Sequence, residues 1–476
     1  MLRGGELTLS WFIFISVVIY LLFIIFWVSK RQQTVSNTKD FLSIGPIKSS
    51  QKAYNLLGKS FEASNASFAT SFLGIFVLTQ INIFYSLYIV FGYLLGIYFF
   101  TKIILPKLSK HIEKGIYYPE MMELHSGSRL IGDFVSLLVI LSLLAFFYAE
   151  IFSFSHGFLI DENGPLSHSS IITLSLVILL AWYTIIGGYR NIVITDFVQI
   201  SVIRVGLFSL IILSLYILFS FGIAEQVMKI VQNDFISFTH FIYFPALIIG
   251  FVFAQVIYYD NWQRLILFYK SISCEDKNID HFLNEASAKY LGSIKYLSFI
   301  FCTPILLALV AEAMGISSLY AFMSHIWEES LFGKALVLLS VLAFVSALLS
   351  TVDTYLLGMV QVLFNRFSKL NLRFIRLLII CLTVGVTPFI ISKIDIAQWF
   401  TFIYYTANMQ VGPVLLALLG IHFNKYVLAV SMLSALFLSV YYSGSEYIDL
   451  IAAVTIVLAT SLNYITRNKK PMDAYV

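Results

Sequence analysis

The sequence predicts an all-α polytopic membrane protein with about thirteen transmembrane helices. Of its 476 residues, 59% are hydrophobic and only 12% are charged, whereas soluble globular chains carry about 25% charged residues. Apolar runs long enough to cross the roughly 30 Å hydrocarbon core of a bilayer recur along the whole chain. Lys and Arg also fall mainly in alternate connections between these runs.

The first apolar run, 9–28, is longer than the apolar core of a signal peptide. Lys30 and Arg31 follow it without a small-residue cleavage site, so we expect an uncleaved first span. The later runs are too densely apolar for soluble amphipathic helices. These later spans are expected at 54–78, 81–104, 130–154, 170–187, 191–220, 240–262, 290–314, 332–363, 372–393, 396–421, 425–443 and 446–466.

The distribution of positive charge predicts an orientation. Connections after the odd-numbered spans carry most of the Lys and Arg, and the other side holds little beyond Arg3, Lys229, Lys334 and Lys393. Because loops rich in Lys and Arg stay in the cytoplasm, we expect the N-terminus outside and the C-terminus inside. We expect a multi-pass protein of the cell (inner) membrane, surrounded by the lipid bilayer as a monomer, with an oligomer left open.

Composition and motifs argue against several classes of function. The net charge is only +4, and no run of Lys or Arg could follow a phosphate backbone, so we expect no nucleic-acid partner. The chain has no phosphate-binding GxxxxGK loop and no HExxH or GxSxG motif. The longest expected cytoplasmic connection, 263–289, is too short for an enzyme domain. We therefore expect a protein that is not an enzyme.

Polar side chains inside a span are costly in lipid, so their clusters are candidate functional sites. Residues 60–71, in the second span, carry Ser, Thr, Asn and Glu side chains on all faces of the expected helix. Such a stretch suits a broken helix whose free carbonyls line a cavity. The alternative is a surface of small residues on which another helix packs closely.

A second cluster occupies one helical face of the ninth span. Ser346, Ser350, Asp353 and Thr354 lie at positions i, i+4, i+7 and i+8, and Thr351 borders them. Hydroxyls and a carboxylate are hard oxygen ligands, which suit a hard cation such as Na⁺. The alternative is that the hydroxyls bond back to their own helix, with the carboxylate at the end of the span.

A third cluster begins at the Gly pair 187–188, which predicts a tight turn between two spans. Asp196 and Gln199 follow on one face of the sixth span, and Arg204 lies two turns further on. Buried charges usually pair, so Arg204 is either functional or the structural partner of an acid such as Asp196 or Glu150.

A fourth cluster, 255–264, lies where the seventh span is expected to leave the membrane. Belt aromatics and a snorkelling Arg264 account for much of it, and Asp260 is expected to be interfacial. Gln255, at its start, is a candidate solute contact.

Together these motifs resemble the sodium/solute symporter family, which includes sodium-coupled transporters of sugars, proline, sialic acid, pantothenate and iodide. The resemblance runs from the first span to about Lys425, and it depends on the order of several motifs along one chain. The matching elements are Lys39-Asp40-Phe41, residues 71–74, residues 112–120, Gly187-Gly188 with Thr195, Asp196 and Gln199, Gln263-Arg264, residues 350–354, and Gly412-Pro413 with Gly420.

The resemblance implies a leucine-transporter-type fold of five-plus-five inverted repeats. The first repeat would be 54–220 and the second 240–421, preceded by the extra helix 9–28 and followed by two trailing helices in 425–466. The binding site would lie mid-membrane between the broken first helices of the two repeats.

The resemblance also implies Na⁺ as the coupling ion, with ligands carried over position by position. The implied sodium ligands are the main-chain carbonyls of Ser64, Ser67 and Ala347 and the hydroxyls of Ser350 and Thr351. A second sodium site, present in some members, would use Asp196, Ser350, Asp353 and Thr354.

The expected partner is a small-molecule solute. The candidate substrate-binding residues are Phe68, Ser71, Glu62 and Gln255. The polar pair of the sugar carriers falls on apolar or aromatic residues near Val90 and Tyr93, and the fourth span lacks the Arg that holds the carboxylate of sialic acid. These departures argue against sugar and sialic acid, and the sequence names no other solute.

The leading hypothesis is a sodium-coupled symporter that moves a small organic solute into the cell by alternating access. One alternative is a proton-coupled carrier on the same fold, which would use Asp196, Asp353 or Glu62. A solute sensor is a further, less favoured hypothesis, since the fold also occurs fused to histidine kinases and no signalling domain follows the spans.

Overall fold

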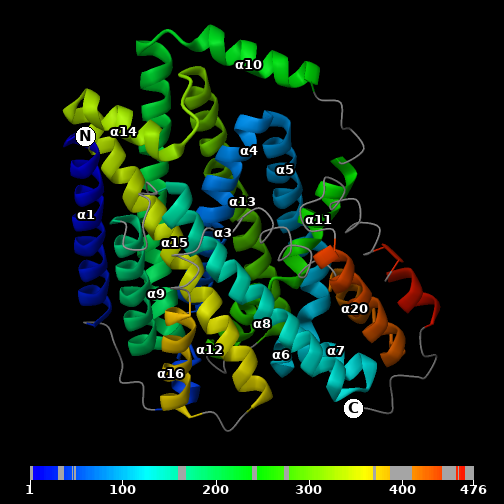
Figure 1. Cartoon of the computed structure of the whole chain (residues 1–476). Coiled ribbons are helices and arrows are strands. Elements are labelled where there is room, and N and C mark those ends of the chain that lie inside the picture. The colour runs from blue at the N-terminus through cyan, green and yellow to red at the C-terminus, as the bar shows by residue number, and fades with distance from the viewer. Residues whose placement is uncertain are drawn as a thin grey trace.

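The computed structural model describes residues 4–29, 37–45, 47, 50–158, 168–237, 244–272, 278–367, 371–385, 410–441, 457–458 and 460–466, and the chain folds into helices throughout these segments (Figure 1). The α-helices are α1 Gly4–Ser29, α2 Thr38–Phe41, α3 Ser50–Asn65, α4 Ile75–Ile81, α5 Ile83–Phe99, α6 Ser109–Lys114, α7 Tyr118–Ser126, α8 Arg129–Phe152, α9 His168–Ser220, α10 Ala224–Ser237, α11 Phe244–Ile257, α12 Tyr259–Ser271, α13 Ile279–Ala313, α14 Leu319–Glu329, α15 Leu331–Arg366, α16 Leu372–Val384, α19 Val411–Leu418 and α20 Lys425–Tyr441. Between them lie the π-helical segments η1 Phe68–Gly74, η2 Phe100–Ile104 and η4 Ser153–Phe158 and the 3-10 turn η3 Leu105–Leu108.

The described helices include five that are long and apolar enough to cross a membrane. They cover Ile83–Lys114, Arg129–Ser155, Thr184–Ser220, Ile279–Ala313 and Leu331–Arg366. Shorter apolar helices accompany them, such as Phe12–Trp27 and Ile172–Trp182. The chain is thus a multi-pass membrane protein. The count of thirteen spans stays a prediction, because much of the expected spans 372–393, 396–421 and 446–466 lies outside the described residues.

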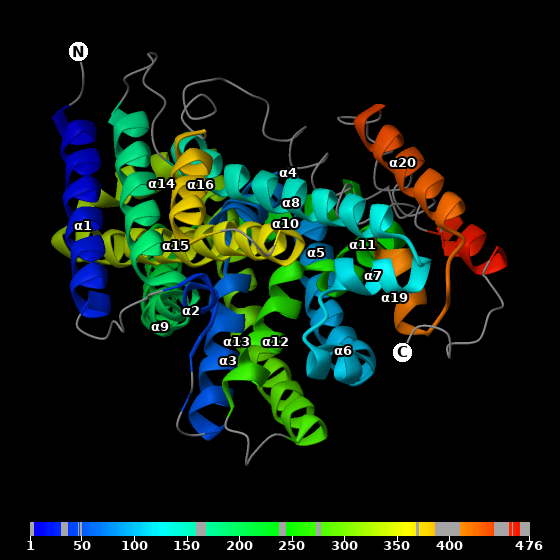
Figure 2. The same ribbon diagram turned by 90° about the horizontal axis from the view of Figure 1, so that it is seen from below.

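The long helix α15 lies at the centre of the bundle and packs against α9, α8 and α3 (Figure 1). Small residues allow the closest approach, since a Cβ added at Gly206 of α9 would come within 2.3 Å of the Cβ of Ala343 on α15. Seen from below, α1 lies at the edge of the bundle, where it packs on α9 (Figure 2). The centre of the molecule is therefore formed by α3, α9 and α15, which carry the first three polar clusters.

Two helices of the bundle are broken near their middle. The predicted break in 60–71 is confirmed, because α3 ends at Asn65 and residues 66–67 are non-helical before η1 begins. We call residues 66–67 the first break. A second break at Tyr258 separates α11 from α12, so the seventh span is also a broken helix, as the resemblance implies.

The predicted tight turn at 187–188 is a kink inside α9. Gly188 has φ +59°, a left-handed conformation that side chains disfavour, and a Cβ there would lie 2.1 Å from the carbonyl oxygen of Phe41. The kink separates the fifth expected span from the sixth and brings the chain onto α2, with which α9 packs. Glycine is needed here for both its conformation and its size.

The prediction of a long cytoplasmic connection at 263–289 is wrong. α12 continues to Ser271 and α13 already begins at Ile279, so helix covers most of that range. The polar residues of α12 are buried against neighbouring helices, and a hydropathy pattern cannot distinguish that arrangement from an exposed loop. Further helices of the described chain also lie outside the predicted spans: α2, α6, α7, α10 and α14.

Candidate functional site

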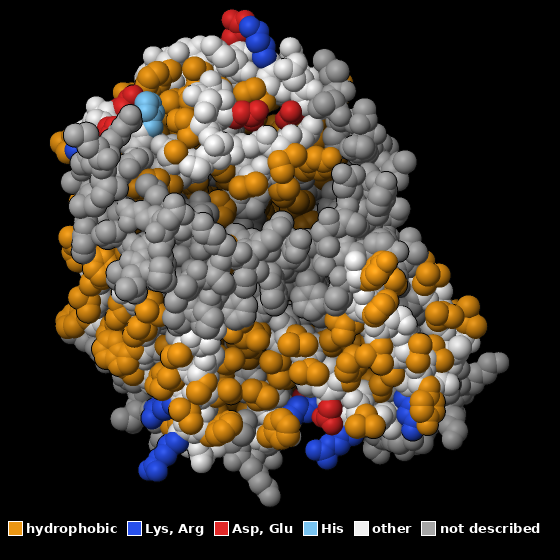
Figure 3. Space-filling model, in the orientation of Figure 1, with side chains coloured by type: hydrophobic (Ala, Val, Ile, Leu, Met, Phe, Trp, Pro, Cys, Tyr) orange, Lys and Arg blue, Asp and Glu red, His pale blue; other side chains and the backbone are white. Residues whose placement is uncertain are grey.

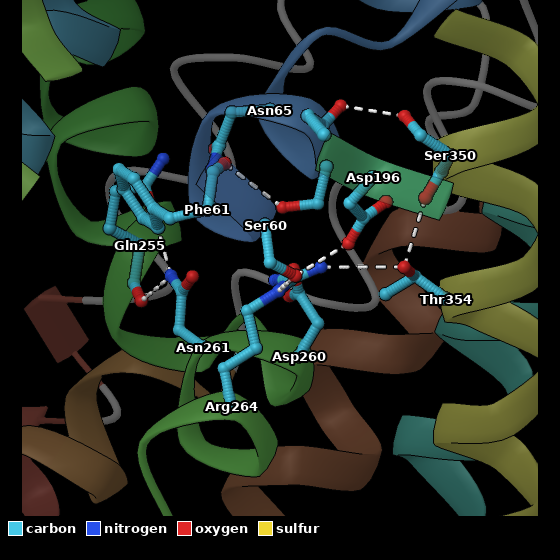
Figure 4. Close-up of polar contacts among 12 residues, drawn as sticks. Ser60, Phe61, Asn65, Asp196, Gln255, Asp260, Asn261, Arg264, Ser350 and Thr354 are labelled. Carbon is cyan, nitrogen blue, oxygen red and sulfur yellow. Dashed lines mark hydrogen bonds and ion pairs between the residues drawn. The ribbon is translucent and has the colours of Figure 1, made fainter. Parts of the chain in front are cut away.

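At the first break, side chains from other helices bind backbone groups of the broken helix. The carbonyl of Ala63 accepts a 2.7 Å hydrogen bond from Ser350 Oγ of α15 (Figure 4). The N–H of Ala69 donates at 3.0 Å to Glu150 of α8. Since the last carbonyls and first N–H groups of any helix segment are orphans, a mid-membrane break must be satisfied in this way.

The predicted sodium ligands lie on the two elements that meet at the Ser350–Ala63 contact, the broken helix and α15. Ser64, near the end of α3, and Ser67, in the first break, are buried, and the ninth-span donors are on the buried core of α15. Ser350 reaches the broken helix, while Thr351 Oγ1 donates back to the carbonyl of Ala347 at 2.9 Å. The structure therefore brings the first-break segment and the predicted α15 donors together at one place.

These donors are all oxygens: main-chain carbonyls and hydroxyls, with no sulfur or imidazole among them. Such a set suits Na⁺, a hard cation, better than a soft metal. The carbonyl contributed by Ala347 and the hydroxyls of Ser350 and Thr351 lie within one helical turn of α15. The residues present thus fit a sodium ion bound between α3 and α15.

A network below the first break joins four helices. Ser60 Oγ of α3 donates to Asp196 Oδ2 of α9 at 2.5 Å, and Arg264 Nε of α12 donates to Ser60 Oγ at 3.2 Å (Figure 4). Arg264 also donates to Asp260 at 2.5 Å and to Thr354 Oγ1 of α15 at 3.3 Å. The other Asp196 oxygen, Oδ1, is buried and has no hydrogen-bond partner among the described residues.

The predictions of a snorkelling Arg264 and an interfacial Asp260 are wrong. The Arg264 side chain is 0% exposed, and the Asp260 side chain is 13% exposed. Acceptors from α3 and α15, together with the acid one turn away, replace the water that a snorkelling guanidinium would reach. The two residues that suggest a membrane interface in the sequence therefore form a buried ion pair.

The predicted second sodium site lies in the same network. Asp353 is fully buried on α15, one residue from Thr354, whose hydroxyl lies 3.4 Å from its carboxylate. Asp196 reaches toward this region from α9, and Ser350 lies one turn away (Figure 4). The structure therefore gathers these four residues near the buried guanidinium of Arg264.

Arg204 pairs with neither of the two acids proposed for it. Its guanidinium forms an ion pair with Glu62 of α3 and stacks on the ring of Tyr296 at 3.9 Å. The other carboxylate oxygen of Glu62 accepts from Ser293 of α13 at 3.3 Å. Both oxygens of Glu62 are thus occupied by residues of α9 and α13, and its predicted part in solute binding stays a prediction.

The candidate solute residues fall on two sides of the first break. Phe68 is buried in an aromatic group, 5.5 Å from the Phe154 ring and 5.4 Å from the Phe344 ring. Ser71 Oγ donates to the Asn65 carbonyl at 3.0 Å and so helps to satisfy the break. The ring contacts of Phe68 are therefore with other aromatic side chains.

On the other side of the first break the candidate residues are polar, and their hydrogen bonds connect the first break with the second. Tyr93 of α5 hydrogen-bonds Asn65 Oδ1 and interacts with Gln255 of α11. The Gln255 side chain accepts from Asn261 Nδ2 at 3.0 Å (Figure 4). Gln255 Nε2 and Asn261 Oδ1 are buried, and no described residue bonds them. One donor and one acceptor therefore remain for a molecule bound between the broken helices.

Two parts of this site are not evident from the sequence pattern. The residues of the Arg264 network also fit a membrane interface, although Gln263-Arg264 matches a motif of the family. The sequence offers Glu150 as a partner of Arg204, but a carboxylate inside the fourth span is by itself a signal, because acids in lipid-crossing helices are rare.

The whole arrangement is similar to solved membrane transporters. A Na⁺-coupled sialic acid symporter in a substrate-bound outward-open state superposes with a TM-score of 0.71 at 17% identity, covering 97% of this chain and 99% of that one. A manganese transporter of Eremococcus coleocola gives a TM-score of 0.53 at 13% identity, with 90% of each chain covered. These likenesses confirm the predicted leucine-transporter-type fold.

The family resemblance is confirmed as well. The sequence profile of the Sodium:solute symporter family matches residues 54–260, which include the first break, the Gly188 kink and Asp196. No curated protein matches the chain.

Proposed function

We propose that this protein is a sodium-coupled symporter that moves a small organic solute by alternating access. Three findings support the proposal: the family match over 54–260, the leucine-transporter-type fold, and the all-oxygen donor set at the first break. The observation that carries most weight is the 2.7 Å contact between Ser350 and the Ala63 carbonyl. It places a predicted sodium ligand of α15 against the broken helix that would supply the others.

The residues suggest how an ion would act. Carbonyls of Ser64 and Ser67 from the broken helix, with the Ala347 carbonyl and the hydroxyls of α15, would hold Na⁺ between two helices. An ion that bridges them favours the arrangement in which both are in place, so it would pre-organise the neighbouring solute site. Coupling of this kind is reciprocal: Na⁺ raises solute affinity by the factor by which solute raises Na⁺ affinity.

We further propose a single well-formed sodium site. At the second predicted site the Arg264 guanidinium already donates to Ser60 and Thr354 and lies near Asp196 (Figure 4). A second cation there would compete with a fixed positive charge. The buried Asp196 Oδ1 keeps one acceptor available if Arg264 moves.

For the solute we favour a small molecule that presents both polar and apolar groups. Gln255 Nε2 and Asn261 Oδ1 offer one donor and one acceptor, and Phe68 with its aromatic neighbours offers an apolar wall. Each buried polar atom left unpaired costs about 1–3 kcal/mol, so a solute that pairs with both gains affinity.

The orientation follows from charge. On the face in Figure 3, Lys and Arg lie mostly at the lower end and acids mostly at the upper end, with hydrophobic side chains between. Because positive loops stay in the cytoplasm, we propose that the lower end faces the cytoplasm of the cell (inner) membrane and that the N-terminus lies outside.

The test is a thermal-stability screen of small solutes against the purified protein in sodium and in choline buffers of equal ionic strength. A bound ligand raises the melting temperature by mass action. We expect a solute whose stabilisation is larger in sodium than in choline. Stabilisation equal in both buffers, together with uptake into liposomes driven by a pH gradient alone, would support the proton-coupled alternative instead.

A further inference from the structure

Glu150 is a buried acid for which the sodium ligands implied by the family leave no role. It lies on α8 three residues before η4 begins, and it is 2% exposed. Its carboxylate accepts from Ser67 Oγ and, at 3.0 Å, from the Ala69 N–H of the broken helix. The side chain of Thr351 on α15 also interacts with it.

The carboxylate has no basic partner in the described part of the chain. Two other buried acids are treated differently: Glu62 pairs with Arg204, and Asp260 pairs with Arg264. A buried carboxylate without a counter-charge is expensive, and hydrogen bonds offset only part of that cost. Its position therefore calls for a positive charge that the described side chains do not provide.

Two neighbours of Glu150 indicate where that charge would lie. Ser67 belongs to the first break and Thr351 belongs to α15, and both are predicted sodium ligands, one through its carbonyl and one through its hydroxyl. The carboxylate thus stands beside the proposed cation, on a third helix that the predicted ligand set does not include.

We propose that Glu150 is the anionic member of the cation site, so that α8 joins α3 and α15 in holding the ion. The proposal rests on the sodium-coupled function above. A carboxylate a few ångströms from the ion adds a direct charge–charge attraction, which carbonyl and hydroxyl dipoles alone do not supply. It also makes the occupied site electrically neutral, which favours burial of the ion in the bilayer.

A purely structural role is the competing explanation, in which Glu150 only caps the freed N–H of Ala69. Glu150→Gln separates the two, because glutamine keeps an acceptor for Ala69 but removes the charge. Glu312→Gln, at the end of α13 and outside the site, is the matched control.

The experiment is calorimetric titration of Na⁺ into the purified protein at constant ionic strength, with thermal stability as a second readout. We expect Glu150→Gln to weaken Na⁺ binding at least tenfold and Glu312→Gln to leave it unchanged. Equal Na⁺ affinity in Glu150→Gln and the unmodified protein would overturn the proposal.

Two other outcomes remain distinct from that one. If the unmodified protein itself binds no Na⁺, the proposed function fails, whatever Glu150 does. If Glu150→Gln does not fold, Glu150→Asp replaces it: the charge is kept but withdrawn by one methylene, so Na⁺ binding weakened by at least threefold supports the proposal and unchanged binding contradicts it.

Discussion

The two broken helices satisfy their breaks with different partners. At the first break other helices contribute in addition to the broken helix's own Ser71: Ser350 of α15 donates to the Ala63 carbonyl, and Glu150 of α8 accepts from the Ala69 N–H. At the second break the chain binds itself. Asn261 Nδ2 donates to the Gln255 carbonyl at 3.1 Å, and Trp262 Nε1 donates to the Val256 carbonyl at 2.8 Å.

This difference indicates which helix responds to an ion. The first break depends on contacts between α3, α8 and α15, so a ligand that binds all three can change its structure. The second break is closed by side chains of its own helix, and α12 is further held by the buried ion pair of Arg264. We expect the first break to be the ion-responsive element and the second to be a stable wall of the site.

The largest expected effect is a loss of stability at α12, which belongs to the wall of the site. Arg264→Ala leaves Asp260 buried without its partner, and breaking a buried pair in this way costs about 3–5 kcal/mol. The exposed Lys229–Glu225 pair on α10 is the control, and Lys229→Ala should cost less than about 1 kcal/mol. Chemical unfolding in detergent measures both, and equal losses would contradict the assigned role of Arg264.

A smaller effect is expected at the second break. Trp262→Phe removes the donor to the Val256 carbonyl and leaves that acceptor buried, at a cost of about 1–3 kcal/mol of stability. Sodium affinity should not change, since the indole N–H donates to the Val256 carbonyl of the same broken helix and phenylalanine keeps an aromatic ring at this position. A drop in Na⁺ affinity of tenfold or more would show that the two breaks are not separate.

A further effect is expected from acid, which should weaken the fold at α7. Burial, with a smaller effect of His422, lowers the pKa of His125 on α7 from 6.5 to about 4. Below pH 6.5 His125 is protonated in the unfolded chain but stays neutral in the folded chain. The free energy of unfolding therefore decreases as the pH falls toward 4, by about 1.4 kcal/mol per pH unit.

Melting temperature against pH tests this expectation. His125→Gln should flatten the fall between pH 6.5 and about 4, because glutamine does not titrate. An unchanged slope in that variant would mean that other groups cause the acid sensitivity.

The sequence allowed the membrane class, the first break and the Gly188 turn to be predicted, because each leaves a local pattern of apolar runs, mixed polar residues or paired glycines. The Arg264 network could not be found in that way. Its partners come from α3, α12 and α15, far apart in the chain, and the same residues fit a membrane interface equally well. Burial and pairing of this kind become visible only when the helices are packed.

The central claim is that Na⁺ binds between the first break and α15. Titration of Na⁺ into Ser350→Ala tests it most directly, with Ser340→Ala as the control, because Ser340 is buried on the same helix but its hydroxyl donates only to the Leu336 carbonyl of α15. We predict Na⁺ affinity at least tenfold weaker for Ser350→Ala and unchanged for Ser340→Ala. Equal Na⁺ affinity in the two variants would contradict the claim.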